Sequence, residues 1–334
     1  MEKKGALPRG YNVPAGLKPK VKQLCQTSLL ISSATACSDW TLIMQCLIVG
    51  KTLTNWDWTW WMLHGLVLWP LCSRALRGLE NLVHEASHGN FHRASQPLND
   101  RVANWLCAYW LFLNVATLRL PHKKHHTLFA TQDDPDKQRF ERLQLDRFPR
   151  EVPRRLVRSV VSSLPVYMWD YWAQFRAQEL STTGQTVSPA TSRAQQLRRS
   201  LGLHILSAGL GSLVVEQFWL HWLLYFWIPW LFYLPVHRLM AEAEEHRYEN
   251  AQSVFEATFS NLGRFQRWFL HPHGDAWHLL HHLVPAIPHW QMRRAHTLLL
   301  QDPAYGGGMI RTSIFEEPGM ESRASDGQWD YHHV

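Results

Sequence analysis

Histidine is abundant in this chain, and much of it lies in three short clusters. The clusters hold eight of the 20 histidines: His84 and His88, then His122, His125 and His126, then His278, His281 and His282. Residues three or four apart share a face of an α-helix, so each cluster is predicted to present its imidazoles along one stripe. Packing so many imidazoles together without a metal would leave many polar nitrogens to satisfy. The clusters therefore predict a metal site.

The number of imidazoles narrows the choice of metal centre. The segment HEASH (84–88) also matches HExxH, the zinc protease motif in which Glu85 would act as the general base. Such a protease needs three protein ligands for one zinc ion, whereas this chain offers far more. Imidazole binds iron, copper and zinc alike. We favour two iron ions, because iron can activate O₂ for attack on unreactive C–H bonds and zinc has no redox chemistry.

The order of the three clusters, separated by apolar segments, resembles the membrane fatty acid desaturase superfamily. The resemblance covers about residues 40–300 and rests on four stretches: VHEASHG (83–89), PHKKHHTLFATQDDPD (121–136), AEAEEH (241–246) and HLLHHLVPAIPHWQMRRAH (278–296). It implies a di-iron centre at the cytoplasmic face, held by the histidines of all three clusters. By residue matching it adds His246, which follows Glu245, to the metal ligands.

One stretch departs from the family pattern. Many relatives carry an Asn-containing segment before the third cluster, whereas this chain has His273, Gly274 and Asp275 there. It stays open whether Asp275 or His273 belongs to the outer shell of the metal centre.

Other polar residues near the clusters have weaker assignments. Asp133, Asp134 and Asp136 could orient imidazoles through hydrogen bonds, or could equally cap a helix or pair with nearby cations. Glu85 is expected to support the ligands rather than to act as a proteolytic base. Most of the remaining histidines near the clusters are expected to be structural or to lie behind the ligands: His92, His271, His289 and His296.

Composition and charge limit the class of protein. The 334 residues are 46% hydrophobic with a net charge of +7, which excludes wholesale disorder. Five cysteines, an odd number, argue against a disulfide scaffold and against a cysteine-based zinc ribbon. The basic residues flank apolar runs, so anionic lipid headgroups rather than nucleic acid are the expected counter-charge.

Five mostly apolar runs set the predicted topology: 29–50, 58–76, 102–118, 201–215 and 218–236. The last run carries no formal charge, which favours a membrane protein over a soluble helical bundle. Cations concentrate in the N-terminal arm and in residues 119–199, which places both on the cytoplasmic side. The run 102–118 is then predicted to be interfacial or re-entrant rather than spanning.

We therefore predict an all-α integral membrane protein of about four spanning helices. These form two transmembrane helical hairpins, 29–76 and 201–236, and a cytoplasmic helical cap carries the di-iron site. The predicted parts are a cytoplasmic N-terminal arm (1–28), a membrane desaturase domain (29–300) and a C-terminal tail (301–334).

The resemblance implies an O₂-dependent desaturase that introduces a double bond into an acyl chain or a related lipid-like substrate. The substrate would be free or carried on lipid, CoA or a carrier protein. A separate ferredoxin or cytochrome b5 is expected to supply two electrons, and basic residues would suit an acidic carrier. Two enzymatic alternatives remain, a hydroxylase on the same scaffold and a zinc-dependent membrane protease. A non-catalytic metal-binding protein is a further alternative.

Overall fold

The computed structural model describes residues 8, 11–52, 57–145, 153–177 and 193–315. Parts of the predicted N-terminal arm and of the predicted C-terminal tail (316–334) lie outside the described residues, as do the segments 146–152 and 178–192. The described chain is mostly helical, with one small parallel sheet, so the predicted all-α class is confirmed.

Two long helical pairs correspond to the predicted hairpins. The first pairs α2 (Leu29–Thr52) with three helical segments that follow one another directly: α3 (Trp58–Leu63), η1 (His64–Leu68) and α4 (Trp69–Ser87). The second pairs α9 (Arg193–Val214) with four successive helical segments: α10 (Phe218–Trp222), η5 (Leu223–Trp227), η6 (Pro229–Tyr233) and α11 (Leu234–Glu245). Among the described residues, no single helix has both the length and the apolar character that crossing a membrane requires.

The run 102–118 does not form one helix. It is divided among α5 (Gln96–Leu106), η2 (Ala108–Leu111) and α6 (Val115–Thr127). Phe112 adopts a left-handed conformation with φ of 58°, which ends η2. Asn114 then caps α6 by accepting a hydrogen bond from the Ala116 amide at 2.9 Å. These breaks direct α6, which carries the second histidine cluster, back across α4.

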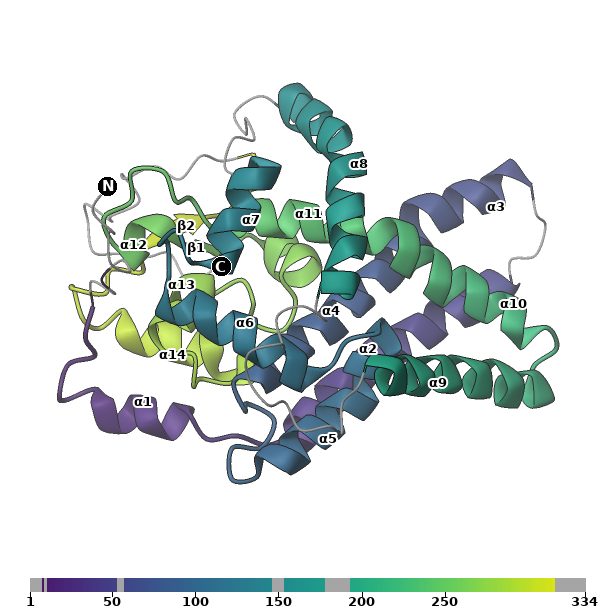
Figure 1. The fold of residues 1–334 in the computed structure, drawn as a ribbon, viewed down its shortest axis with the longest axis horizontal. Helices are drawn as coiled ribbons and strands as arrows, with labels where there is room; N and C mark the ends of the chain where they lie inside the picture. The colour runs from purple at the N-terminus through teal and green to yellow at the C-terminus, as the bar shows by residue number, and fades with distance from the viewer. Residues whose placement is uncertain (1–7, 9–10, 53–56, 146–152, 178–192, 316–334) are drawn as a thin grey trace.

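Most of the remaining elements gather at one end of the helical pairs (Figure 1), whereas α8 (Pro153–Ala177) packs against α11. The gathered elements are α1 (Lys18–Leu24), α7 (Pro135–Leu143), α12 (Val254–Ala257), β1 (Phe259–Asn261), η7 (Gln266–Leu270), α13 (His278–Leu283), η8 (His289–Gln291), α14 (Met292–Leu299) and β2 (Met309–Arg311). Strands β1 and β2 pair in parallel, with Phe259 opposite Met309. Helices α3, α9 and α10 lie toward the opposite end of the molecule (Figure 1).

A buried carboxylate joins α2 to this end of the molecule. Asp39 is fully buried within α2, where it pairs with Arg74 of α4 and lies 2.6 Å from Nε2 of His273. Gly78 lies at the same crossing, and a Cβ there would be 2.5 Å from Asp39 Oδ2 and 2.7 Å from His273 Nε2. The absence of a side chain at Gly78 is therefore what admits the carboxylate.

Gly78→Ala is expected to be destabilising because its methyl group would overpack this crossing, at a cost of about 1–3 kcal/mol. Thermal unfolding of the purified protein, followed by circular dichroism, measures the effect. The control is Gly202→Ala in α9, where an added Cβ meets nothing within 4 Å and alanine favours the helix. A melting temperature for Gly78→Ala that equals that of Gly202→Ala would contradict the close packing.

Candidate metal centre

Four segments bring the nine predicted ligand histidines to one region. His84 lies in the last turn of α4 and His88 is its C-cap residue. Helix α6 carries the second cluster and α13 the third, and His246 directly follows α11. The packing of α6 against α4 places the first two clusters together. The predicted ligands, drawn from 84 to 282 in the sequence, are therefore gathered in space.

Five of these histidines form what we call the first imidazole group: His84, His88, His122, His126 and His281. One ring nitrogen from each lies within 4.8 Å of the others. The Nε2 atom of His122 lies 2.7 Å from those of His84 and His88. The Nε2 atom of His126 lies 3.0 Å from that of His281. Only His281 is fully buried, so this group retains some access from outside.

The other four form the second imidazole group: His125, His246, His278 and His282. All four are buried. The Nε2 atoms of His125 and His282 are 3.3 Å apart, and those of His246 and His278 are 3.1 Å apart. The two groups adjoin, because the ring centroids of His126 and His282 are only 4.5 Å apart.

The assignment of neighbouring histidines to different groups corrects the expectation of one stripe for each cluster. His125 and His126 are adjacent in α6 but belong to different groups, as are His281 and His282 in α13. Successive residues of an α-helix point about 100° apart, whereas residues four apart nearly align. Each HxxHH cluster thus divides its side chains between the two groups.

The chemistry of both groups fits metal ions. Burial lowers the pKa of His278 to about 3 and that of His88 to about 4, so both rings are neutral near pH 7. Neutral imidazole is the form that binds metals. With metal–nitrogen bonds of about 2.1 Å, neighbouring ligand nitrogens lie about 3.0–3.4 Å apart. The separations of 3.0–3.3 Å fall in this range, whereas the two at 2.7 Å, from His122 to His84 and to His88, are shorter.

This chain is similar to known proteins over most of its length. Residues 58–313 match the family model described as fatty acid desaturase. The chain belongs to the fatty acid desaturase family. It is also similar to dihydrorhizobitoxine desaturase of Bradyrhizobium elkanii, with 26% identity over 271 residues, which covers 77% of this chain and 73% of the relative. The protein is therefore an oxidoreductase of the desaturase type.

One aspartate of the desaturase both orients an imidazole and caps a helix, the two roles that the sequence left open. Asp134 is fully buried, and its Oδ1 accepts a hydrogen bond from His125 Nδ1 at 2.9 Å. The same carboxylate caps α7 by accepting from the Asp136 amide at 2.9 Å. Asp136 lies further away, 3.4 Å from His125 Nδ1, and Asp133 is exposed.

These carboxylates fix the state of His125. Burial acts to lower its pKa, but the charge of Asp136 and the hydrogen bond to Asp134 outweigh burial and raise it. Because Nδ1 carries the donated proton, Nε2 keeps its lone pair directed at the second imidazole group.

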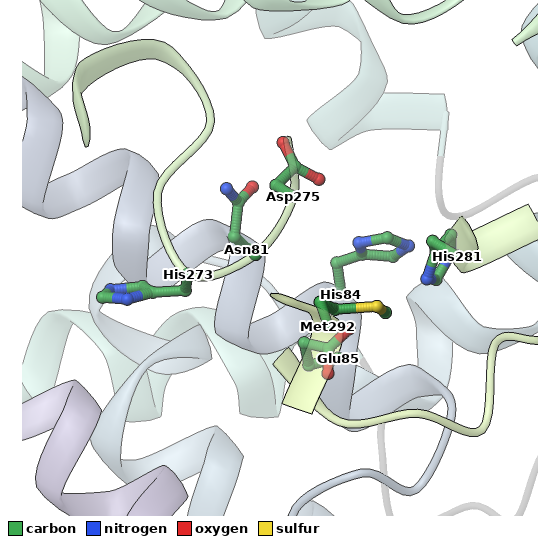
Figure 2. A pocket seen from close by; sticks show the side chains of 8 residues that line it. Asn81, His84, Glu85, His273, Asp275, His281 and Met292 are labelled. Atoms are coloured by element: carbon green, nitrogen blue, oxygen red, sulfur yellow. The ribbon is translucent and has the colours of Figure 1, made fainter. Parts of the chain in front are cut away.

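In the stretch before the third cluster, His273 and Asp275 have different roles. His273 bonds to Asp39 and points away from His84 and His281, as Figure 2 shows. Asp275 pairs with Arg77 at 3.1 Å and with His271 Nδ1 at 3.2 Å. His273 is therefore an anchor to α2, whereas Asp275 belongs to a layer of charged groups behind the imidazoles.

A small cavity borders the first imidazole group. Figure 2 shows His84 and His281 facing each other at its edge, with Asn81, Glu85, Asp275 and Met292 also lining it. Glu85 Oε2 accepts hydrogen bonds from the His289 amide at 2.8 Å and from Asn90 Nδ2 at 3.1 Å. Glu85 thus joins α4 to the segment after the third cluster. This agrees with the expectation that it supports the ligands rather than acting as a proteolytic base. His281, far from HEASH in sequence, shares the group of His84 and His88, which argues against an isolated protease motif.

The sequence reasoning did not predict a network of buried ion pairs behind the centre. Arg77 of α4 pairs with Glu80, Glu245 and Asp275. Glu80 also pairs with Arg238 of α11, and Glu242 pairs with Arg139 and Arg238, so that the network ties α4, α7 and α11 together. Burial acts to raise the pKa of Glu242, but the two arginines outweigh it and lower the pKa to about 2. The available signal was the presence of Arg77 and Glu80 between the apolar run 58–76 and the first histidine cluster.

Glu245 differs from the other acids of this network. Burial raises its pKa to about 7, and the negative charge of Asp275 acts in the same direction. A carboxylate oxygen of Glu245 lies within 4.8 Å of ring nitrogens of both His246 and His278. Glu245 therefore borders the second imidazole group directly.

The other nearby histidines have partners outside the two groups. His271 pairs with Glu244 and Asp275, and His296 Nδ1 lies 2.9 Å from the Tyr305 hydroxyl. His289 Nε2 lies 3.2 Å from Thr35 Oγ1. His92 is half-buried and joins neither imidazole group.

Proposed function

We propose that the protein is an O₂-dependent di-iron desaturase that introduces a double bond into an acyl chain or a related lipid-like substrate. The observation that carries the proposal is the convergence of nine imidazoles from four segments into two adjoining groups. Two ions with several nitrogen ligands each account for this arrangement, whereas one four-coordinate ion does not. The membership of the desaturase family supports the same chemistry.

The roles of the chain's own residues follow from the geometry. The two imidazole groups would hold one iron ion each, and Asp134 orients His125. Bound iron would supply the reduction of O₂ and the removal of hydrogen from a methylene group, using two electrons from an external carrier. The more accessible first group is the side from which we expect O₂ and substrate to approach. The placement of the methylene group then decides between an alkene and an alcohol.

A hydroxylase acting on the same scaffold, with a carotenoid, a sphingoid base or a small secondary metabolite as its substrate, is the second candidate. The relative named for dihydrorhizobitoxine is not named for a fatty acid, which favours testing substrates other than acyl chains. Mass analysis of the product separates the two reactions, because desaturation removes two hydrogens and hydroxylation adds one oxygen.

We also propose that the two helical pairs lie in a bilayer with the metal centre at the cytoplasmic face. Large apolar side chains are exposed along them, among them Leu30, Trp58, Leu66, Leu213 and Trp219. Such a surface is suited to lipid. Exposed lysines beside the second cluster, Lys123 and Lys124, would favour docking of an acidic ferredoxin or cytochrome b5.

Expression in a host with a defined lipid pool, together with a ferredoxin or cytochrome b5 and its reductase, tests the function. We expect mass spectrometry of total lipids and polar metabolites to find a new product two hydrogens lighter than its precursor. A product that carries an added oxygen would favour the hydroxylase. No O₂ consumption with any reductant or substrate class would contradict both.

Removal of metal gives a separate expected result. Chelation should abolish activity, and Fe(II) but not Zn(II) should restore it, because zinc has no redox chemistry. Metal analysis of the active protein should find two iron ions per chain. One zinc ion per chain in active protein would contradict the proposal.

A further inference from the structure

We propose that Glu245 supplies a carboxylate ligand to the iron ion held by the second imidazole group. The inference rests on the proposed di-iron function and adds an oxygen donor to a centre otherwise built from histidine. Its starting point is position: an oxygen of Glu245 lies within 4.8 Å of nitrogens from both His246 and His278. Two ligands on opposite sides of one ion are about 4.2 Å apart, so only a small adjustment is needed.

The second step concerns the two carboxylate oxygens. Oε1 pairs with Arg77 Nη2 at 3.3 Å. Oε2 takes part in no hydrogen bond or ion pair with the part of the chain that the structure describes. The Glu245 side chain is 13% exposed, and a cation or a hydrogen-bond donor would satisfy this second oxygen. An iron ion beside His246 and His278 would do so, and Arg77 would fix the orientation of the carboxylate from behind.

The third step compares Glu245 with the other acids nearby. Glu242 is occupied by Arg139 and Arg238, and Asp275 by Arg77 and His271. Glu244 accepts from Gln266 and pairs with His271. Among the described residues, Glu245 is the acid whose oxygen lies with ring nitrogens of both His246 and His278. Asp134 instead contacts Nδ1 of His125, not the Nε2 atom that faces His282.

The donor count supports the same assignment. The first group offers five imidazoles and the second offers four. A carboxylate from Glu245 would give each ion five protein donors. The two ions would then differ in chemistry, because only the second would have a hard oxygen ligand.

The test measures iron rather than turnover. Purified wild-type protein and Glu245→Gln are loaded anaerobically with Fe(II), and iron content and Mössbauer spectra are recorded. We expect wild type to show two iron sites. In Glu245→Gln one site should bind Fe(II) at least about tenfold more weakly, because removal of residues that only support a ligand already costs 10–100-fold, while the signal of the other site stays unchanged.

Three further variants separate a ligand from a structural residue. Glu249→Gln, an exposed glutamate nearby, should match wild type. Arg77→Lys keeps a cation among the acids and should retain both irons; loss equal to that of Glu245→Gln would assign the effect to the ion pair and overturn the proposal. Glu245→Asp keeps the carboxylate, so it should bind both irons and shift the Mössbauer parameters of one site.

Failure of the inference and failure of the proposed function give different results. If wild type binds two iron ions and both Glu245 variants have its affinity and spectra, Glu245 is not a ligand. If wild type itself binds no iron, or a single zinc, the di-iron function fails and the ligand assignment fails with it. Should Glu245→Gln not fold, unchanged spectra for Glu245→Asp alone would overturn the assignment.

Discussion

His126→Ala is expected to abolish product formation, with activity reduced at least about a hundredfold. Its Nε2 lies 3.0 Å from those of both His122 and His281, and its ring lies 4.5 Å from that of His282 in the second imidazole group. Loss of residues that only support a metal ligand costs 10–100-fold, so loss of a ligand where the two groups meet costs more. Product yield by mass spectrometry and iron per chain measure the effect.

His92→Ala is the matched control for this prediction. His92 follows the first cluster in sequence but belongs to neither imidazole group. It should keep wild-type iron content and activity. Normal iron content and product formation in His126→Ala would show that the imidazole groups do not form the reaction centre.

Asp134→Ala is expected to weaken iron binding by about 10–100-fold and to destabilise the fold by about 1 kcal/mol. The first effect follows because His125 loses the acceptor that fixes its Nδ1 proton. The second follows because α7 loses its N-cap. Iron titration and thermal unfolding measure the two effects separately.

Two further variants divide these roles. Asp134→Ser keeps a capping oxygen but is too short to hold His125, so it should restore stability without restoring iron affinity. Asp133→Ala removes an exposed neighbour and should behave as wild type. Full iron affinity in Asp134→Ser would show that the contact with His125 has no part in metal binding.

The histidine spacing was sufficient to predict which side chains gather. Pairs four residues apart, such as His84 with His88 and His122 with His126, remain in one imidazole group because local helix geometry aligns them. The matching of His246 depended on the family resemblance, and the structure places it beside His278. The helical class and the breaks near Asn114 also follow from local residue preferences.

Only the tertiary structure decided how the ligands divide. Helix geometry points His125 and His126 about 100° apart, but which group each of them faces depends on the positions of α4, α11 and α13 around α6. The same holds for Asp39, a polar residue within an apolar run that bonds across the molecule to His273. It holds also for Glu245, which pairs with Arg77 and has a carboxylate oxygen within 4.8 Å of nitrogens of His246 and His278. Sequence determines the ligand types and their local faces through helix geometry, whereas long-range packing determines which nitrogens and oxygens converge.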